Sequence, residues 1–143
     1  MTNASNGYAG DMTPTEAWDM LQSSPDAQLV DVRSMPEWSF VGVPELASLG
    51  KEPALLAWRI YPHMDLNPVF VEECKTLAGD ADTPLLFLCR TGARSKEAAI
   101  AMTQAGYTHC YNILNGFEGD LNPDGKRGNL TGWKAEQLPW RQN

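Results

Sequence analysis

The chain has 143 residues, of which 43% are hydrophobic and 20% are charged, and this balance predicts one compact domain and excludes a disordered chain. The 18 acidic residues outnumber the 11 basic ones, so nucleic acid and anionic membranes are not expected partners. No stretch approaches the roughly 20 apolar residues of a membrane helix. The first residues also lack the basic and apolar segments of a secretion signal, so we expect a cytoplasmic protein.

The N-terminal region divides into a short leading segment and the start of the domain. We expect residues 1–12 to be a flexible N-terminus that can add an edge strand, and residues 13–143 to form a single domain. Thr13 can cap a helix, because a proline follows it and Glu16 stands three residues further on. These signals predict a helix over residues 14–23.

A short buried strand is expected over residues 29–32, which are apolar apart from Asp31. Its end presents Asp31 and Arg33. An ordinary salt-bridged pair at a strand end and a supporting role beneath a neighbouring loop are equally good interpretations, and the two are compatible.

The next segments are less regular. A helical turn is expected over residues 36–40, with Trp38 and Phe40 available to pack inward. Residues 54–60 favour a third strand, although their alanines and leucines would suit a helix equally well.

The C-terminal half alternates helices and strands. We expect a helix from Asn67 to about residue 80, a strand over 84–89, a helix over 95–105 and a last strand over 109–114. This alternation predicts an α/β fold with a central parallel sheet of about five strands and helices on both faces.

Cys89 is the most informative residue, because it ends the buried strand at the sheet edge where α/β proteins bind ligands. The loop that follows can direct backbone N–H groups and two guanidinium groups at one anion. We therefore expect the sulfur to ionise easily and to act as a nucleophile. The candidate binding residues around it are Arg90, Thr91, Gly92, Ala93, Arg94 and Ser95.

The other two cysteines lack such surroundings. Cys74 falls at helical spacing with apolar residues, and Cys110 lies in an alternating strand, so both are interpreted as packing residues. Cys89 itself could be only a small buried hydrophobe, but that role has no use for an anion cradle. Three cysteines without paired spacing suggest neither a disulfide framework nor a zinc site, so no metal is expected.

The chain resembles the rhodanese (sulfurtransferase) family in two segments, Cys89-Arg90-Thr91-Gly92-Ala93-Arg94-Ser95 and Leu29-Val30-Asp31-Val32-Arg33, the second followed by Glu37-Trp38 and Gly42. The resemblance implies a single rhodanese-like domain over 13–143 that needs no cofactor. It also implies that Cys89 carries a persulfide sulfur, taken from a small anionic donor such as thiosulfate and passed to cyanide, a thiol or a protein acceptor. Asp31 and Arg33 would support the loop.

One segment departs from the family pattern. Many members have Gly-His-Ile-Pro-Gly-Ala after the second strand, whereas this chain has Gly42-Val43-Pro44-Glu45-Leu46. The change affects the crossover that forms one wall of the pocket, and the sulfur chemistry does not depend on it.

Two other functions compete with sulfur transfer. A cysteine-dependent phosphatase or arsenate reductase also holds a thiolate in a strand–loop–helix cradle, but its motif places an arginine six residues after the cysteine. Here that position is Ser95, and Arg94 stands one residue earlier, which redirects its guanidinium fork. The second alternative is a rhodanese-fold module that binds a partner without catalysis, against which the intact cysteine argues.

Overall fold

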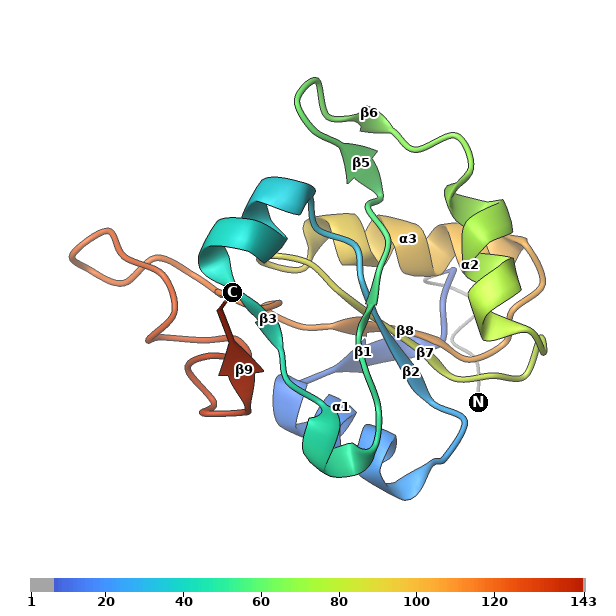
Figure 1. Cartoon of the computed structure of the whole chain (residues 1–143), viewed down its shortest axis with the longest axis horizontal. Helices are drawn as coiled ribbons and strands as arrows, with labels where there is room; N and C mark the ends of the chain where they lie inside the picture. The colour runs from blue at the N-terminus through green and yellow to red at the C-terminus, as the bar shows by residue number, and fades with distance from the viewer. Residues whose placement is uncertain (1–6, 143) are drawn as a thin grey trace.

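A five-stranded parallel sheet forms the centre of the computed structural model, which describes residues 7–142 (Figure 1). The strand order is β1-β8-β7-β2-β4, and each neighbouring pair is parallel. The predicted α/β fold with a central parallel sheet of about five strands is confirmed. The strands are β1 (Gly10–Met12), β2 (Gln28–Asp31), β4 (Ala54–Leu55), β7 (Leu85–Leu88) and β8 (Cys110–Ile113).

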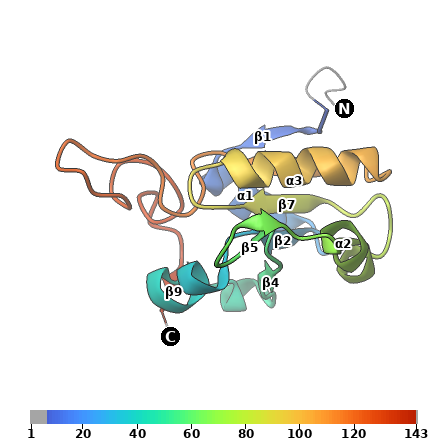
Figure 2. The same cartoon turned by 90° about the horizontal axis from the view of Figure 1, so that it is seen from above.

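Helices cover both faces of this sheet. Helices α2 (Phe70–Ala78) and α3 (Ala93–Gln104) pack on one face, and Figure 2 looks onto that face. Helix α1 (Pro14–Ser23) packs on the other, with the 3-10 turn η2 (Ala47–Leu49) and the C-terminal segment. Because β7 is buried on both faces, it reads as a continuous apolar run in the sequence.

Helix α1 has the predicted bounds, and its N-terminal cap is complete. The Thr13 hydroxyl accepts the Glu16 N–H at 3.1 Å, and the Glu16 carboxylate accepts the Thr13 N–H at 2.8 Å. Two of the backbone donors that a helix N-terminus leaves without partners are thus satisfied.

Residues 54–60 do not form one strand, so this prediction was wrong. Only β4 pairs with β2, after which the chain leaves the sheet edge and Trp58 packs edge-on against Phe70, with ring centroids 5.0 Å apart. Strand β5 (Arg59–Ile60) pairs instead with β6 (Asp65–Leu66) in a projecting antiparallel hairpin (Figure 1).

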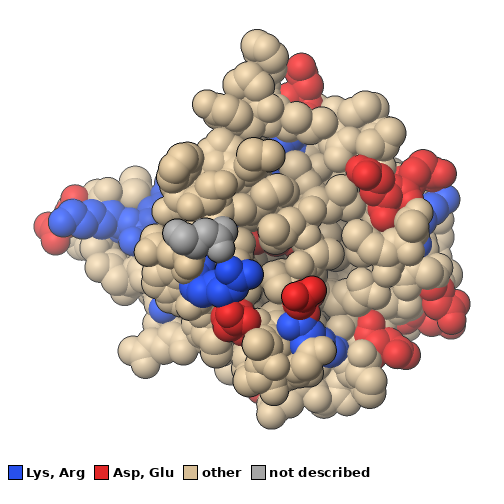
Figure 3. All heavy atoms as spheres, in the orientation of Figure 1, with Lys and Arg blue, Asp and Glu red and all other residues tan. Residues whose placement is uncertain are grey.

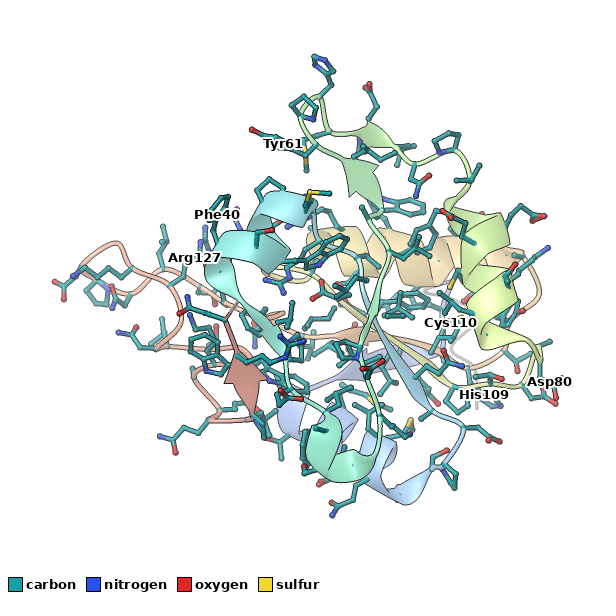
Figure 4. The ribbon with its side chains drawn as sticks, in the orientation of Figure 1. Phe40, Tyr61, Asp80, His109, Cys110 and Arg127 are labelled. Carbon is teal, nitrogen blue, oxygen red and sulfur yellow. The ribbon has the colours of Figure 1, made fainter. Side chains whose placement is uncertain are left out.

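The segment after β2 forms the helical turn expected there, a π-helix η1 (Glu37–Val41). The inward packing expected of Phe40 was wrong, since this side chain is 79% exposed and points away from the body (Figure 4). The next segment is Gly42-Val43-Pro44-Glu45-Leu46, where the sequence departs from the family pattern. It contains β3 (Val43–Pro44), which pairs with β9 (Trp140–Arg141) near the C-terminus.

The N-terminal strand β1 lies at the sheet edge beside β8. Of the segment expected to be flexible, residues 1–6 lie outside the described residues. Over residues 7–142, no helix combines the length and apolar character that a membrane crossing requires. The same residues contain no group of three or more metal-ligating side chains placed to hold an ion.

Candidate functional site

Cys89 follows β7 directly, and its side chain is 1% exposed. The chain then turns at Gly92, whose φ of +116° is a backbone conformation that side chains other than glycine's rarely adopt. The Gly92 N–H points back and donates to the Cys89 sulfur at 3.0 Å. Helix α3 begins at Ala93, two residues earlier than predicted, so the sulfur lies against its first turn.

Ser95 supplies the second polar contact to the sulfur. Its Oγ lies 3.2 Å from the Cys89 Sγ and donates a hydrogen bond of 2.6 Å to the Oδ1 of Asn112 on β8. Ser95 is fully buried and Asn112 is 4% exposed. Sequence analysis missed Asn112, although its polar side chain in an otherwise buried strand was a signal that could have been read.

Arg94 is held by an acid that sequence analysis left without a role. Its Nη1 and Nη2 donate to Oε1 and Oε2 of Glu37 at 2.8 and 2.9 Å. Burial alone would raise the pKa of Glu37, but the hydrogen bonds and charge of Arg94, helped by donors from Ser34, lower it to about 2. The pair joins the first turn of α3 to η1.

The backbone of the loop is braced by the segment after β8. The carbonyl of Cys89 accepts the N–H of Phe117 at 2.8 Å, and the carbonyl of Arg90 accepts those of Glu118 and Gly119 at 3.0 and 3.1 Å. Gly116 makes this close approach feasible, because a Cβ at its position would clash with the Cys89 and Arg90 carbonyls.

Asp31 and Arg33 form a fully buried ion pair. Arg33 donates through Nε and Nη2 to the two carboxylate oxygens at 2.9 and 2.7 Å, and through Nη2 to the Gly42 carbonyl at 2.7 Å. Its guanidinium also lies 4.3 Å from the centroid of the Phe117 ring. The pair therefore contacts the segment that braces the loop, and it fixes the end of η1.

A depression of about 460 Å³ opens beside the loop, between η1, the tip of the β5–β6 hairpin and the segment after β8. Arg90 is exposed here, and among residues 7–142 its guanidinium forms no ion pair. Thr91 is half-buried and Ala93 exposed. The depression is lined by Glu37, Val41, Met64, Arg90, Arg94 and Glu118.

Charge is unevenly spread over the rest of the molecule. On the face shown in Figure 3, acidic side chains gather over the side that carries α2, whereas basic side chains reach the opposite end, where the C-terminal loop projects. In the depression itself, Arg94 is paired with Glu37, which leaves the exposed Arg90 together with Glu118 as the remaining charged residues of the lining.

The two remaining cysteines lie in the apolar core. Burial raises the pKa of Cys74 to about 12 and that of Cys110 to about 11. Both side chains are fully buried, and Figure 4 shows Cys110 within the body of the molecule. Neither is a nucleophile at neutral pH, in agreement with their interpretation as packing residues.

The comparisons place the chain among proteins of known family. Residues 9–143 match the model of the STR4 middle domain. The crystal structure of Rv0390 from M. tuberculosis superposes with a TM-score of 0.85 at 50% identity, covering 95% of this chain and 99% of that one.

Two sequence relatives extend the comparison. The uncharacterized protein RC0915 of Rickettsia conorii is 41% identical over 89% of this chain and 93% of its own length. The thiosulfate sulfurtransferase GlpE of Glaesserella parasuis is 30% identical over 76% of this chain and 83% of its own length. The chain therefore belongs to the rhodanese family, within which it matches the STR4 middle domain.

Proposed function

We propose that the protein is a sulfurtransferase that moves a sulfane sulfur from a donor such as thiosulfate to cyanide or a thiol through a persulfide on Cys89. The observation that carries this proposal is the position of the Cys89 sulfur against the first turn of α3, where the Gly92 N–H donates to it. Helix N-termini and backbone N–H groups favour a thiolate, which is the reactive form of cysteine.

In the first half-reaction, the Cys89 thiolate attacks the outer sulfur of thiosulfate. A new S–S bond forms to Cys89, the S–S bond of the donor breaks, and sulfite leaves with the electron pair. Arg90 is the cation best placed to hold the sulfonate end of the donor, because the charge of Arg94 is already matched by Glu37.

The persulfide then rests in the cradle that held the thiolate. The N–H groups of Ala93, Arg94 and Ser95 lie in the first turn of α3, where no carbonyl of the helix can accept them. They are preorganised to stabilise negative charge on the outer sulfur. In the second half-reaction, cyanide or a thiolate attacks that sulfur, and the electron pair of the broken S–S bond returns to Cys89.

A phosphatase or arsenate reductase is the weaker candidate. Such an enzyme needs an arginine fork that is available to grip two oxygens of a tetrahedral anion, and here both terminal nitrogens of Arg94 are bound to Glu37. The three reduced cysteines suit a reducing compartment such as the cytoplasm, which is where we propose the reaction occurs.

The test is mass spectrometry of the intact protein after incubation with thiosulfate. We expect a gain of one sulfur atom that maps to Cys89, disappears on addition of cyanide and is absent in Cys89→Ser. Cys74 and Cys110 serve as internal controls, because burial in the apolar core raises the pKa of both thiols. Thiosulfate-dependent transfer that persists in Cys89→Ser would overturn the assignment, and turnover of an aryl phosphate by the wild type would favour the phosphatase.

A further inference from the structure

A chain of hydrogen bonds runs from the edge strand of the sheet to the sulfur. Tyr8 Oη donates to Asp11 Oδ1 at 2.8 Å, and Asn112 Nδ2 donates to the same oxygen at 3.1 Å. The series of hydrogen bonds continues through the Ser95 hydroxyl. Its Oγ lies 2.6 Å from Asn112 Oδ1 and 3.2 Å from Cys89 Sγ. Asp11 is exposed, whereas the other four side chains are at most 4% exposed.

The chemistry of the groups fixes the direction of each hydrogen bond. A carboxylate can only accept, so Asp11 orients the Asn112 amide with its NH₂ toward β1 and its carbonyl oxygen toward Ser95. That oxygen can also only accept, so it takes the single proton of the Ser95 hydroxyl. Ser95 is left with a lone pair, and not a proton, to offer to the sulfur.

Tyr8 keeps the other end of the chain in place. Burial, together with the hydrogen bond and the charge of Asp11, raises the pKa of Tyr8 to about 12. The phenol is therefore protonated at neutral pH and remains a donor to Asp11.

We propose that Asp11 and Asn112 are positioning residues that hold the Ser95 hydroxyl as an acceptor for the Cys89 thiol proton, so that Ser95 is a two-position switch. In the resting protein the hydroxyl proton is on the Asn112 side, and this arrangement favours the protonated sulfur. When Cys89 ionises, the hydroxyl turns and donates to the thiolate, and Asn112 Oδ1 loses its donor.

These hydrogen bonds control the orientation of the Ser95 hydroxyl, and they do not conduct protons. A neutral amide cannot take up the proton of a hydroxyl and pass it on, so the chain cannot carry the thiol proton to Asp11. The proton of Cys89 leaves directly to solvent or to the bound donor. The hydrogen-bond chain from Asp11 to Ser95 favours the thiol, whereas the Gly92 N–H favours the thiolate. The balance between these two effects sets how much thiolate the resting site contains.

The catalytic meaning of the switch rests on the proposed sulfurtransferase function, but the switch itself can be measured without sulfur transfer. The readout is the rate at which iodoacetamide alkylates Cys89 as a function of pH. We expect Asp11→Ala to move the midpoint of this profile down by about one pH unit, which is about a tenfold gain in thiolate at pH values below both midpoints. Without Asp11 the amide of Asn112 can turn its NH₂ to Ser95 and release the hydroxyl proton for the sulfur.

Two further variants separate orientation from a field effect of the Asp11 charge. Asp11→Asn removes the charge but keeps an oxygen that accepts from Asn112, so its profile should stay near that of the wild type. In a Ser95→Ala background, Asp11→Ala should produce no shift, because the residue that transmits the orientation is gone. The charged pairs near Cys89, Arg94 with Glu37 and Arg33 with Asp31, are unchanged in the wild type, the two Asp11 variants, Ser95→Ala and the double variant.

The proposal fails if Asp11→Ala leaves the profile unchanged, if Asp11→Asn shifts it as much as Asp11→Ala, or if the shift persists without Ser95. Thermal unfolding of each variant checks that the fold is intact, and Cys89→Ser shows which part of the label belongs to Cys89. Absence of a thiosulfate-derived persulfide in the wild type would contradict the proposed function while leaving the alkylation results interpretable.

Discussion

Glu37 and Arg94 face each other with both oxygens and both terminal nitrogens engaged, at 2.8 and 2.9 Å. Their side chains are 17% and 18% exposed, so water screens the pair only partly. Glu37 also accepts from the backbone N–H and hydroxyl of Ser34, at 3.1 and 2.9 Å. One carboxylate therefore fixes the first turn of α3, beside the sulfur, to the start of η1.

Replacing Glu37 by glutamine should destabilise the protein in a pH-dependent way. The carboxyl has a pKa of about 2 in the folded protein, against an ordinary value of 4.5, so it adds stability when ionised. We expect the wild type to exceed Glu37→Gln by about 2 to 3 kcal/mol in free energy of unfolding at pH 7. This difference should be complete above about pH 5 and should disappear as the pH falls toward 2. Urea unfolding from pH 7 to pH 2 measures it, and a constant difference would contradict the pairing.

Arg90→Ala should weaken use of the donor without disabling the sulfur. The side chain is exposed at the depression, and removing a single charge from an anion site costs about 1 to 2 kcal/mol, or roughly tenfold in KM for thiosulfate. Steady-state kinetics should show a much smaller change in kcat and partial recovery in Arg90→Lys. Lys126→Ala removes a positive charge from an exposed turn and should match the wild type. An equal effect of the two variants would indicate a general charge effect.

Arg33→Met should cost about 3 to 5 kcal/mol in free energy of unfolding, because it leaves the Asp31 carboxylate buried without its partner. The exposed Glu72–Lys75 pair is the matched control, with side chains 76% and 44% exposed. Lys75→Met should change the stability by less than about 1 kcal/mol. Chemical denaturation compares the two, and similar small losses would show that the buried pair contributes little.

The parts of the fold that follow from local pattern were predictable. The cap at Thr13 and the apolar run of β7 each carry their signal in adjacent residues, so α1 and the strand before Cys89 lie where the sequence indicates. The end of β4 depends instead on the contact between Trp58 and Phe70, which are 12 positions apart. Periodicity within residues 54–60 could not reveal that contact.

In the site too, contacts within one short segment could be predicted, whereas contacts between distant segments could not. The cysteine, the glycine turn and the serine lie within one short segment, so their convergence could be expected. Glu37 reaches Arg94 from 57 positions away, and Asp11 reaches Asn112 from 101 positions away. Asp11 and Asn112 are register partners on the parallel strands β1 and β8, whereas Glu37 and Arg94 lie in the segments that follow the paired strands β2 and β7. Both contacts depend on strand pairing, which a single sequence indicates only approximately.

Gly116→Ala tests whether the close approach of the segment after β8 shapes the loop that follows Cys89. The glycine has a φ of +59°, and a Cβ there would overlap the backbone of Cys89 and Arg90, which cannot move aside as a flexible side chain could. Gly125 has a similar φ of +77° but open space around it, so Gly125→Ala isolates the conformational cost. That cost is about 1 to 2 kcal/mol, and the overlap in Gly116→Ala should add about 1 to 3 kcal/mol more. Because the displaced backbone is that of the nucleophile, Gly116→Ala should also slow persulfide formation in protein that remains folded, whereas Gly125→Ala should not. Equal losses of stability with unchanged persulfide formation would show that this contact does not set the position of the sulfur.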